Sequence, residues 1–291
     1  MPTHAYKRAS AVAAVVATAG LVTASAGFLA PANAAGTPLT YSCNAPVLGP
    51  TPFTVTNDSN APATMYVGQS AAIKLTSKVT IPGSMASLLY AVGGRTADGT
   101  ATAKGTIGGK ATTSTLAVPT TTIPQEGDLT VTATGNGGTY KATKPGRVTL
   151  TAGDFTSTLN IYDEDGAPLT GISPATVPCT APAGANTTFD TITVKKDKTK
   201  VKVATRAKGK KVAAKVTVKT AHGSTAKGKV TVTVKKGKKT VEKKKAHLNK
   251  HGKVTVKLPK KLKKGKYTVT VKYAGNAGLK GSTGKHTIKV K

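Results

Sequence analysis

Lysine is the residue type whose spacing most clearly indicates chemistry in this chain. Lysines frame short runs of valine and threonine, as in residues 215–219 (KVTVK) and 229–235 (KVTVTVK). Side chains two residues apart on a β-strand project to the same side, about 7 Å apart. Such lysines would form rows of ammonium groups, which suit a repeating polyanion bound through counterion release. We expect the following lysines to contribute as a field and not as a discrete site: Lys215, Lys219, Lys229, Lys235, Lys253, Lys257, Lys266 and Lys272.

The distribution of charge supports a binding role for these lysines. The formal net charge of the 291 residues is +32, and residues 191–291 contain 33 Lys and Arg against only two acids, Asp197 and Glu242. Lysines that only solubilise a β-domain and protect its edges would not require such an excess. Self-repulsion at this density destabilises a compact domain, so a counter-charge is expected. The expected partners are anionic polymers outside the cell, such as cell-wall teichoic acid, anionic polysaccharide or released DNA.

Base-specific recognition of nucleic acid is not expected. Tyr267 and Tyr273 are the only aromatic residues of the lysine-rich part, and both fall in the apolar register of their strand. Readout of single-stranded bases depends on aromatic side chains that stack on them.

Other kinds of chemistry have weaker support in the sequence. His222, His247, His251 and His286 lie among lysines, whose charge opposes a divalent metal, so we expect no metal site. Residues 280–286 (KGSTGKH) resemble a phosphate loop only in part, because Leu279 replaces the first glycine. We therefore expect neither a cofactor nor an enzyme. The alternative is an enzyme in the N-terminal half, and its candidate carboxylates are Asp154, Asp163 and Asp165.

The elements that must position the lysines are β-strands. In residues 253–258 and 266–273, valine, leucine and tyrosine alternate with threonine and lysine, and 286–291 continues the pattern. Two antiparallel sheets packed through their apolar faces would present the lysines to water. Residues 265–269 (GKYTV) and 273–282 (YAGNAGLKGS) make the region resemble a bacterial immunoglobulin-like repeat domain. That resemblance implies a non-catalytic spacer or adhesive module of exported proteins.

The N-terminal half contains short strand patterns, such as 129–132 and 147–151, separated by glycine-containing turns. This pattern predicts a β-sandwich, in which residues 85–92 (MASLLYAV) are a short helix or a buried strand. Cys43 and Cys179 lie near the two ends of this half, and we expect them to form a disulfide. Residues 39–43 (LTYSC) and 177–179 (VPC) resemble a family of secreted actinobacterial β-domains of unknown function, which implies a compartment but no activity.

The first residues have the order of a secretory signal: Lys7 and Arg8, an apolar stretch, and Ala-Asn-Ala at 32–34. We expect cleavage after Ala34 and no transmembrane segment in the mature protein. The predicted organisation is a signal at 1–34, an N-terminal β-sandwich domain at 35–180, a linker at 181–195 and a lysine-rich immunoglobulin-like domain at 196–291. The sequence thus predicts a secreted or cell-wall-associated, all-β, non-catalytic monomer. A structural spacer without a ligand of its own is the alternative.

Overall fold

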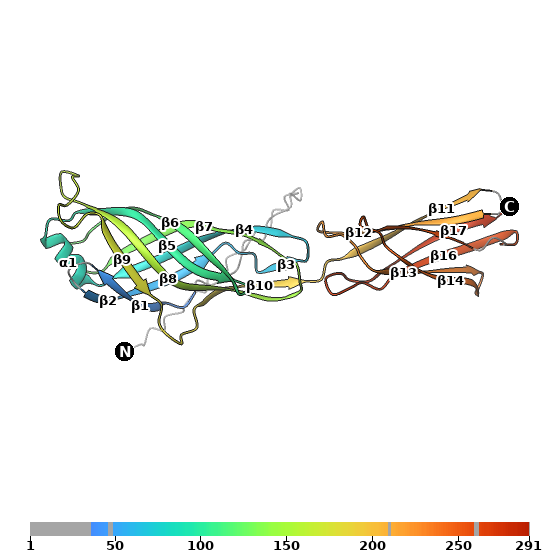
Figure 1. The fold of residues 1–291 in the computed structure, drawn as a ribbon, viewed down its shortest axis with the longest axis horizontal. Helices are drawn as coiled ribbons and strands as arrows, with labels where there is room; N and C mark the ends of the chain where they lie inside the picture. Colours follow the sequence, from blue (N-terminus) through green and yellow to red (C-terminus); the bar gives the residue numbers. More distant parts are fainter. Residues whose placement is uncertain (1–35, 46–48, 209–210, 259–261, 291) are drawn as a thin grey trace, which may run out of the picture. The chain divides into compact units, whose positions relative to one another are not determined.

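The computed structural model describes residues 36–45, 49–208, 211–258 and 262–290, and these form two successive β-domains (Figure 1). The predicted all-β, tandem architecture is therefore confirmed. The expected signal segment at 1–34 lies outside the described residues.

The first domain contains ten strands and one helix among the described residues. The segment at 85–92, for which the sequence allowed a helix or a strand, belongs to helix α1 (Gly83–Ala91). The helix begins after Pro82, and its Gly83 N–H donates to the Asp128 carboxylate at 2.8 Å, which satisfies one of the free amides of the first turn. The strands are β1 (Leu39–Ala45), β2 (Gly49–Ser59), β3 (Thr64–Tyr66), β4 (Ser70–Ile81), β5 (Thr96–Ile107), β6 (Lys110–Thr122), β7 (Leu129–Lys141), β8 (Gly146–Tyr162), β9 (Ala175–Thr180) and β10 (Thr188–Lys195).

The sequence predicted a β-sandwich for this domain; in the structure its strands belong to one sheet that closes on itself. Strand order runs β8-β5-β6-β7-β4-β2-β1-β9, and β9 pairs again with β8. Eight strands close into a barrel whose interior is just wide enough for side chains or one small ligand. Strand β8 allows the closure because it is long: its first part pairs with β10 and its second part with β9. Helix α1 lies at one end of these strands (Figure 1).

Two pairs of neighbouring strands in the barrel share only two residue pairs each. A disulfide joins one of these strand pairs, and a glycine allows the close approach of the other. Strands β1 and β9 share two residue pairs, one of which is Cys43 opposite Cys179. The predicted disulfide is confirmed, with the two Cα atoms 4.0 Å apart. Strands β6 and β7 also share two pairs, at Leu116–Gly135 and Ala117–Thr134. A Cβ atom at Gly135 would lie 2.3 Å from the Thr115 carbonyl oxygen, so only glycine permits this approach.

The segment expected to be a linker contributes a strand instead. β10 pairs with β8 over Thr188–Val194 and with β3 in parallel. Ile192 and Val194 are buried in a second apolar cluster with Met65 and Leu150. The small residues at 180–188 concealed this strand, because the alternation begins only after them.

The second domain is a sandwich of two sheets. Its strands are β11 (Thr199–Lys208), β12 (Lys211–Thr220), β13 (Lys229–Lys236), β14 (Lys239–His247), β15 (Lys253–Lys257), β16 (Gly265–Tyr273) and β17 (Ser282–Val290). One sheet has the order β11-β12-β15 and the other β14-β13-β16-β17. Ten valines pack between them, each at most 7% exposed, and each such burial stabilises the fold by about 1.5–3 kcal/mol.

Two tyrosines complete this core, as their register in the sequence predicts. Tyr267 and Tyr273 are 2% and 0% exposed. The Tyr267 hydroxyl donates to the Lys263 carbonyl at 2.6 Å, and the Tyr273 hydroxyl donates to the Lys227 carbonyl at 2.9 Å. A tyrosine bonded to backbone a few residues upstream is the tyrosine corner of immunoglobulin-like sandwiches.

Candidate functional site

The outer face of the four-stranded sheet gathers lysine and threonine in register. One row across the strands runs Lys245, Thr231, Lys272 and Thr283. The adjacent row runs Lys243, Thr233, Thr270 and Lys285. Alternation along each strand turns the valines of β13 and β16 inward and these side chains outward.

This face is hollowed into an open groove of about 950 Å³. Threonines of the central strands, such as Thr233 and Thr270, are half-buried and form its floor, whereas the lysines are exposed. The lysines along the groove are Lys229, Lys235, Lys243, Lys245, Lys272 and Lys285. The threonines are Thr231, Thr233, Thr240, Thr268, Thr270 and Thr283. Hereafter this surface is called the lysine groove.

The two acids of the second domain leave the charge of the lysine groove uncompensated. Glu242 lies opposite Val234, on the inward-facing side of β14. Asp197 is fully buried and bonded elsewhere in the domain. Within the described part of the chain, the one basic side chain that pairs with a carboxylate is His222, which contacts Asp197, so no lysine there has a carboxylate partner. An anionic ligand would therefore meet ammonium groups that no internal carboxylate neutralises.

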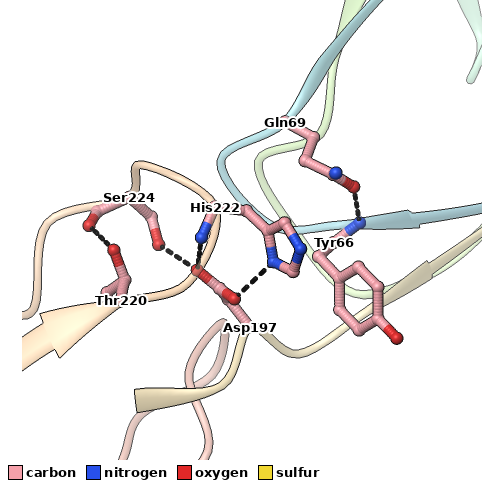
Figure 2. A network of polar contacts seen from close by, with 6 residues as sticks. All are labelled: Tyr66, Gln69, Asp197, Thr220, His222 and Ser224. Carbon is pink, nitrogen blue, oxygen red and sulfur yellow. Dashed lines mark hydrogen bonds and ion pairs between the residues drawn. The ribbon is translucent and has the colours of Figure 1, made fainter. Parts of the chain in front are cut away.

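Asp197 accepts hydrogen bonds from three donors of one loop (Figure 2). The His222 ring Nδ1 lies 2.7 Å away, the His222 backbone N–H 3.0 Å and the Ser224 hydroxyl 3.2 Å. Burial raises the pKa of Asp197, but the bonds from His222 and Ser224 outweigh it, so this pKa lies below its usual value of 3.8. The arrangement holds the loop after β12 to the start of the domain, and it is structural.

The structure divides the eight lysines predicted from the sequence between two faces. Lys229, Lys235 and Lys272 line the lysine groove. Lys266 lies on the same face of β16, directly opposite Lys289 on β17. The other four are exposed on the outer face of the three-stranded sheet: Lys215, Lys219, Lys253 and Lys257.

Three groove lysines escaped the sequence analysis. Lys243 and Lys245 lie on β14, where Lys244 and Glu242 occupy the inward positions and hide the apolar alternation. Lys244 Nζ donates to the Lys257 carbonyl at 3.2 Å, so even this inward lysine is tied to the opposite sheet. Lys285 lies within the segment similar to a phosphate loop, which is strand β17 in the structure.

Two of the three candidate carboxylates of the first domain, Asp154 and Asp163, accept hydrogen bonds from the backbone. The Asp163 carboxylate accepts from the N–H groups of Asp165 and Ala167, at 3.0 and 2.8 Å, which closes the turn after β8. Asp154 accepts from the Ala181 N–H at 2.9 Å. Among the described residues, no three His, Cys, Asp or Glu side chains gather as a metal site would require.

Comparison with known families and structures places both halves of the chain. The family model described as "Family of unknown function (DUF6801)" matches residues 40–190, and "Bacterial Ig-like domain (group 3)" matches residues 199–291. Both resemblances stated from the sequence are thereby confirmed. No curated protein matches the chain. In the described residues, no helix has the length and apolar character needed to cross a membrane.

Similar solved structures are distant. A "Putative membrane anchored protein" from Corynebacterium diphtheriae is 14% identical with a TM-score of 0.43, and the match covers 88% of this chain and 58% of that one. The β-D-glucuronidase of Dictyoglomus thermophilum is 10% identical with a TM-score of 0.23, covering 88% and 43%. The β-glucuronidase of Ruminococcus gnavus is 10% identical with a TM-score of 0.21, covering 86% and 44%. The chain therefore spans less than two thirds of each of these proteins.

Proposed function

The chain belongs to the family of unknown function DUF6801 and carries a bacterial Ig-like domain of group 3, and from this pairing we propose an exported, non-catalytic protein that binds anionic polymers. The Ig-like domain binds the polymer electrostatically, with the lysine groove at the centre, and so displays the first domain. Cell-wall teichoic acid and extracellular polyanions of similar charge density are the ligands that this chemistry fits.

One observation carries the proposal: six lysines and six threonines surround one groove, and no carboxylate lines it. Lysine ammonium groups pair with phosphate or carboxylate oxygens, and threonine hydroxyls below them are able to donate to the same oxygens. A polymer chain lying along the groove would release counterions for each ammonium group it meets.

The compartment is consistent with such a ligand. A disulfide joins Cys43 and Cys179, and disulfides persist in oxidising compartments outside the cytosol. Together with the Ig-like domain, this bond fits an extracellular or cell-surface protein.

Binding to isolated Gram-positive cell walls, before and after removal of teichoic acid, tests the proposal. Salt is varied from about 50 to 500 mM, because counterion release makes the logarithm of the affinity fall linearly with the logarithm of the salt concentration. We expect binding that weakens steeply with salt and with teichoic acid removal. Absence of binding at the lowest salt would leave the protein as a structural spacer.

A matched pair of variants locates the binding surface. The groove variant replaces Lys243, Lys245, Lys272 and Lys285 with glutamine, and the control replaces Lys200, Lys202, Lys215 and Lys253 on the outer face of the other sheet. Both lose the same charge. We expect the groove variant to lose most of the affinity and to lower the salt slope by roughly 3. Equal losses would assign binding to the overall field of the domain and not to the groove.

A further inference from the structure

The interior of the barrel is incompletely filled. Inward positions carry small residues, among them Ala101, Ala103 and Ala133, and a cavity of about 70 Å³ remains between them. The interior of an eight-stranded barrel is either packed with side chains or shaped around one small ligand. The Tyr41 hydroxyl donates to the Gly153 carbonyl at 3.2 Å beside this cavity. Burial, and secondly the charge of Asp154, raise the pKa of Tyr41, as expected for an interior of low polarity.

A second, larger pocket of about 200 Å³ opens beneath helix α1. Its walls are α1, the ends of β8 and β9 and the inward residues of β2 and β4, and every lining side chain is apolar. Phe53, Ile81, Leu159 and Val177 line both this pocket and the interior cavity. The two spaces thus adjoin, with these four side chains between them.

The entrance is marked by exposed apolar side chains. Leu88 and Val92 are 42% and 46% exposed, and they lie four residues apart at the C-terminal end of α1. Both also line the pocket. Val241 on β14 is the third large apolar side chain of comparable exposure among the described residues. Two of the three therefore flank a single opening, next to an apolar hollow.

We propose that this pocket binds the unbranched aliphatic chain of an amphiphile, with its polar end outside near Leu88 and Val92. A cavity of about 150 Å³ lined by apolar side chains is enough to bind benzene, so the pocket volume is sufficient for a small apolar ligand. A linear chain would extend past the shared side chains toward the adjoining interior cavity, whereas a ring would not, and this favours a linear chain. Since every lining side chain is apolar, the pocket itself recognises no headgroup.

The test uses neutral ligands, because a fatty-acid carboxylate would also bind the lysines of the second domain. Isothermal titration of the full protein compares the linear alcohols hexanol, octanol and decanol with cyclooctanol. We expect affinity to rise roughly fourfold per added methylene and then to level off when the pocket is full. Cyclooctanol should bind at least tenfold more weakly than octanol. No binding of decanol up to its solubility, or equal binding of octanol and cyclooctanol, would overturn the proposal.

Variants place the site. Ala175→Leu fills the pocket from β9 and should abolish binding, and Leu88→Gln at the exposed entrance should weaken it several-fold. Val241→Gln removes similar exposed apolar surface from the other domain and should leave binding unchanged. If Ala175→Leu fails to fold, Leu88→Gln combined with Val92→Gln decides the question at exposed positions. Unchanged binding in that double variant, or an equal loss in Val241→Gln, would contradict the site.

Discussion

The first domain closes eight strands of one sheet into a ring and leaves β3 as an edge beside it, whereas the second leaves the edges of two sheets open and places lysine on them. Closure costs the first domain a tightly filled core, because a ring of eight strands surrounds a space that its alanines do not fill. The second domain packs valine against valine, but its edge strand β14 carries Lys243, Lys244 and Lys245 in succession. Charged edges prevent pairing with other chains. The distinctive feature of the first domain is therefore its unfilled interior, and that of the second domain is its lysine-rich outer surface.

The largest expected effect is the loss of stability of the first domain when its disulfide is removed, because the second domain has no such bond among the described residues. Replacing Cys43 and Cys179 with alanine should lower the unfolding free energy of the first domain by about 4–5 kcal/mol, because the bond closes a loop with a sequence separation of 136. The second domain should change by less than about 0.5 kcal/mol. Hydrogen exchange followed by mass spectrometry measures both domains in one molecule. Equal losses in both would show that they unfold as one cooperative unit.

Asp197 is the corresponding anchor of the second domain. Asp197→Ala removes the acceptor of three hydrogen bonds and should cost this domain about 2–3 kcal/mol, with Asp197→Asn intermediate. Because the folded state lowers the pKa of Asp197, its contribution is complete above the unfolded value of 3.8 and disappears as the pH falls through the lower folded value. Urea unfolding between about pH 5 and 2 measures this. An acid dependence that persists unchanged in Asp197→Asn would exclude this carboxylate as its source.

The contact between β6 and β7 tests whether closure of the barrel stabilises the first domain. Gly135→Ala places a Cβ atom 2.3 Å from the Thr115 carbonyl oxygen and should cost about 1–3 kcal/mol. Thr134→Ala, at an exposed neighbouring position, is the control and should cost less than about 0.5 kcal/mol. Thermal unfolding monitored by circular dichroism compares them. Similar melting temperatures would mean that the sheet tolerates an opening there.

The smallest effect concerns repulsion between lysines. Lys266 and Lys289 face each other directly across β16 and β17. Lys289→Gln should raise the unfolding free energy of the second domain by about 0.3 kcal/mol at low salt. The gain should vanish at high salt, because salt screens the repulsion. Melting temperatures of variant and parent at two salt concentrations measure it. A gain that survives high salt would have a cause other than charge.

Local pattern was sufficient for β12, β13, β15, β16 and β17 of the second domain and for the disulfide at the ends of the first. The alternation in residues 229–235 and 266–273 predicted β13 and β16 because both strands have one face on the core. The pairing of Cys43 with Cys179 followed from their places at the two ends of one half. Strand β14 was missed because an edge strand has no need to alternate when its inward positions are only partly covered.

Closure of the barrel was beyond local pattern for a different reason. It depends on β8 pairing with β9 and on a two-residue contact at Gly135, and the pattern within a strand does not specify which other strand it pairs with. The groove likewise arises from the register of four strands, so Lys243 and Lys285 meet one surface although they lie far apart in the sequence. The sequence therefore showed that lysines are abundant and exposed, but not which of them share one surface.

The crosslink between Cys43 and Cys179 also determines how the protein would carry mechanical load. Once β10 is separated from β8, a pull on the chain from either side of the first domain passes from β1 to β9 through the two sulfur atoms and bypasses the strands between them. The 136 residues of separation would extend to roughly 450 Å if they were free, at about 3.3 Å per residue. While the bond is intact, the segment between the two cysteines cannot extend, so the barrel keeps its shape when the chain outside it is stretched.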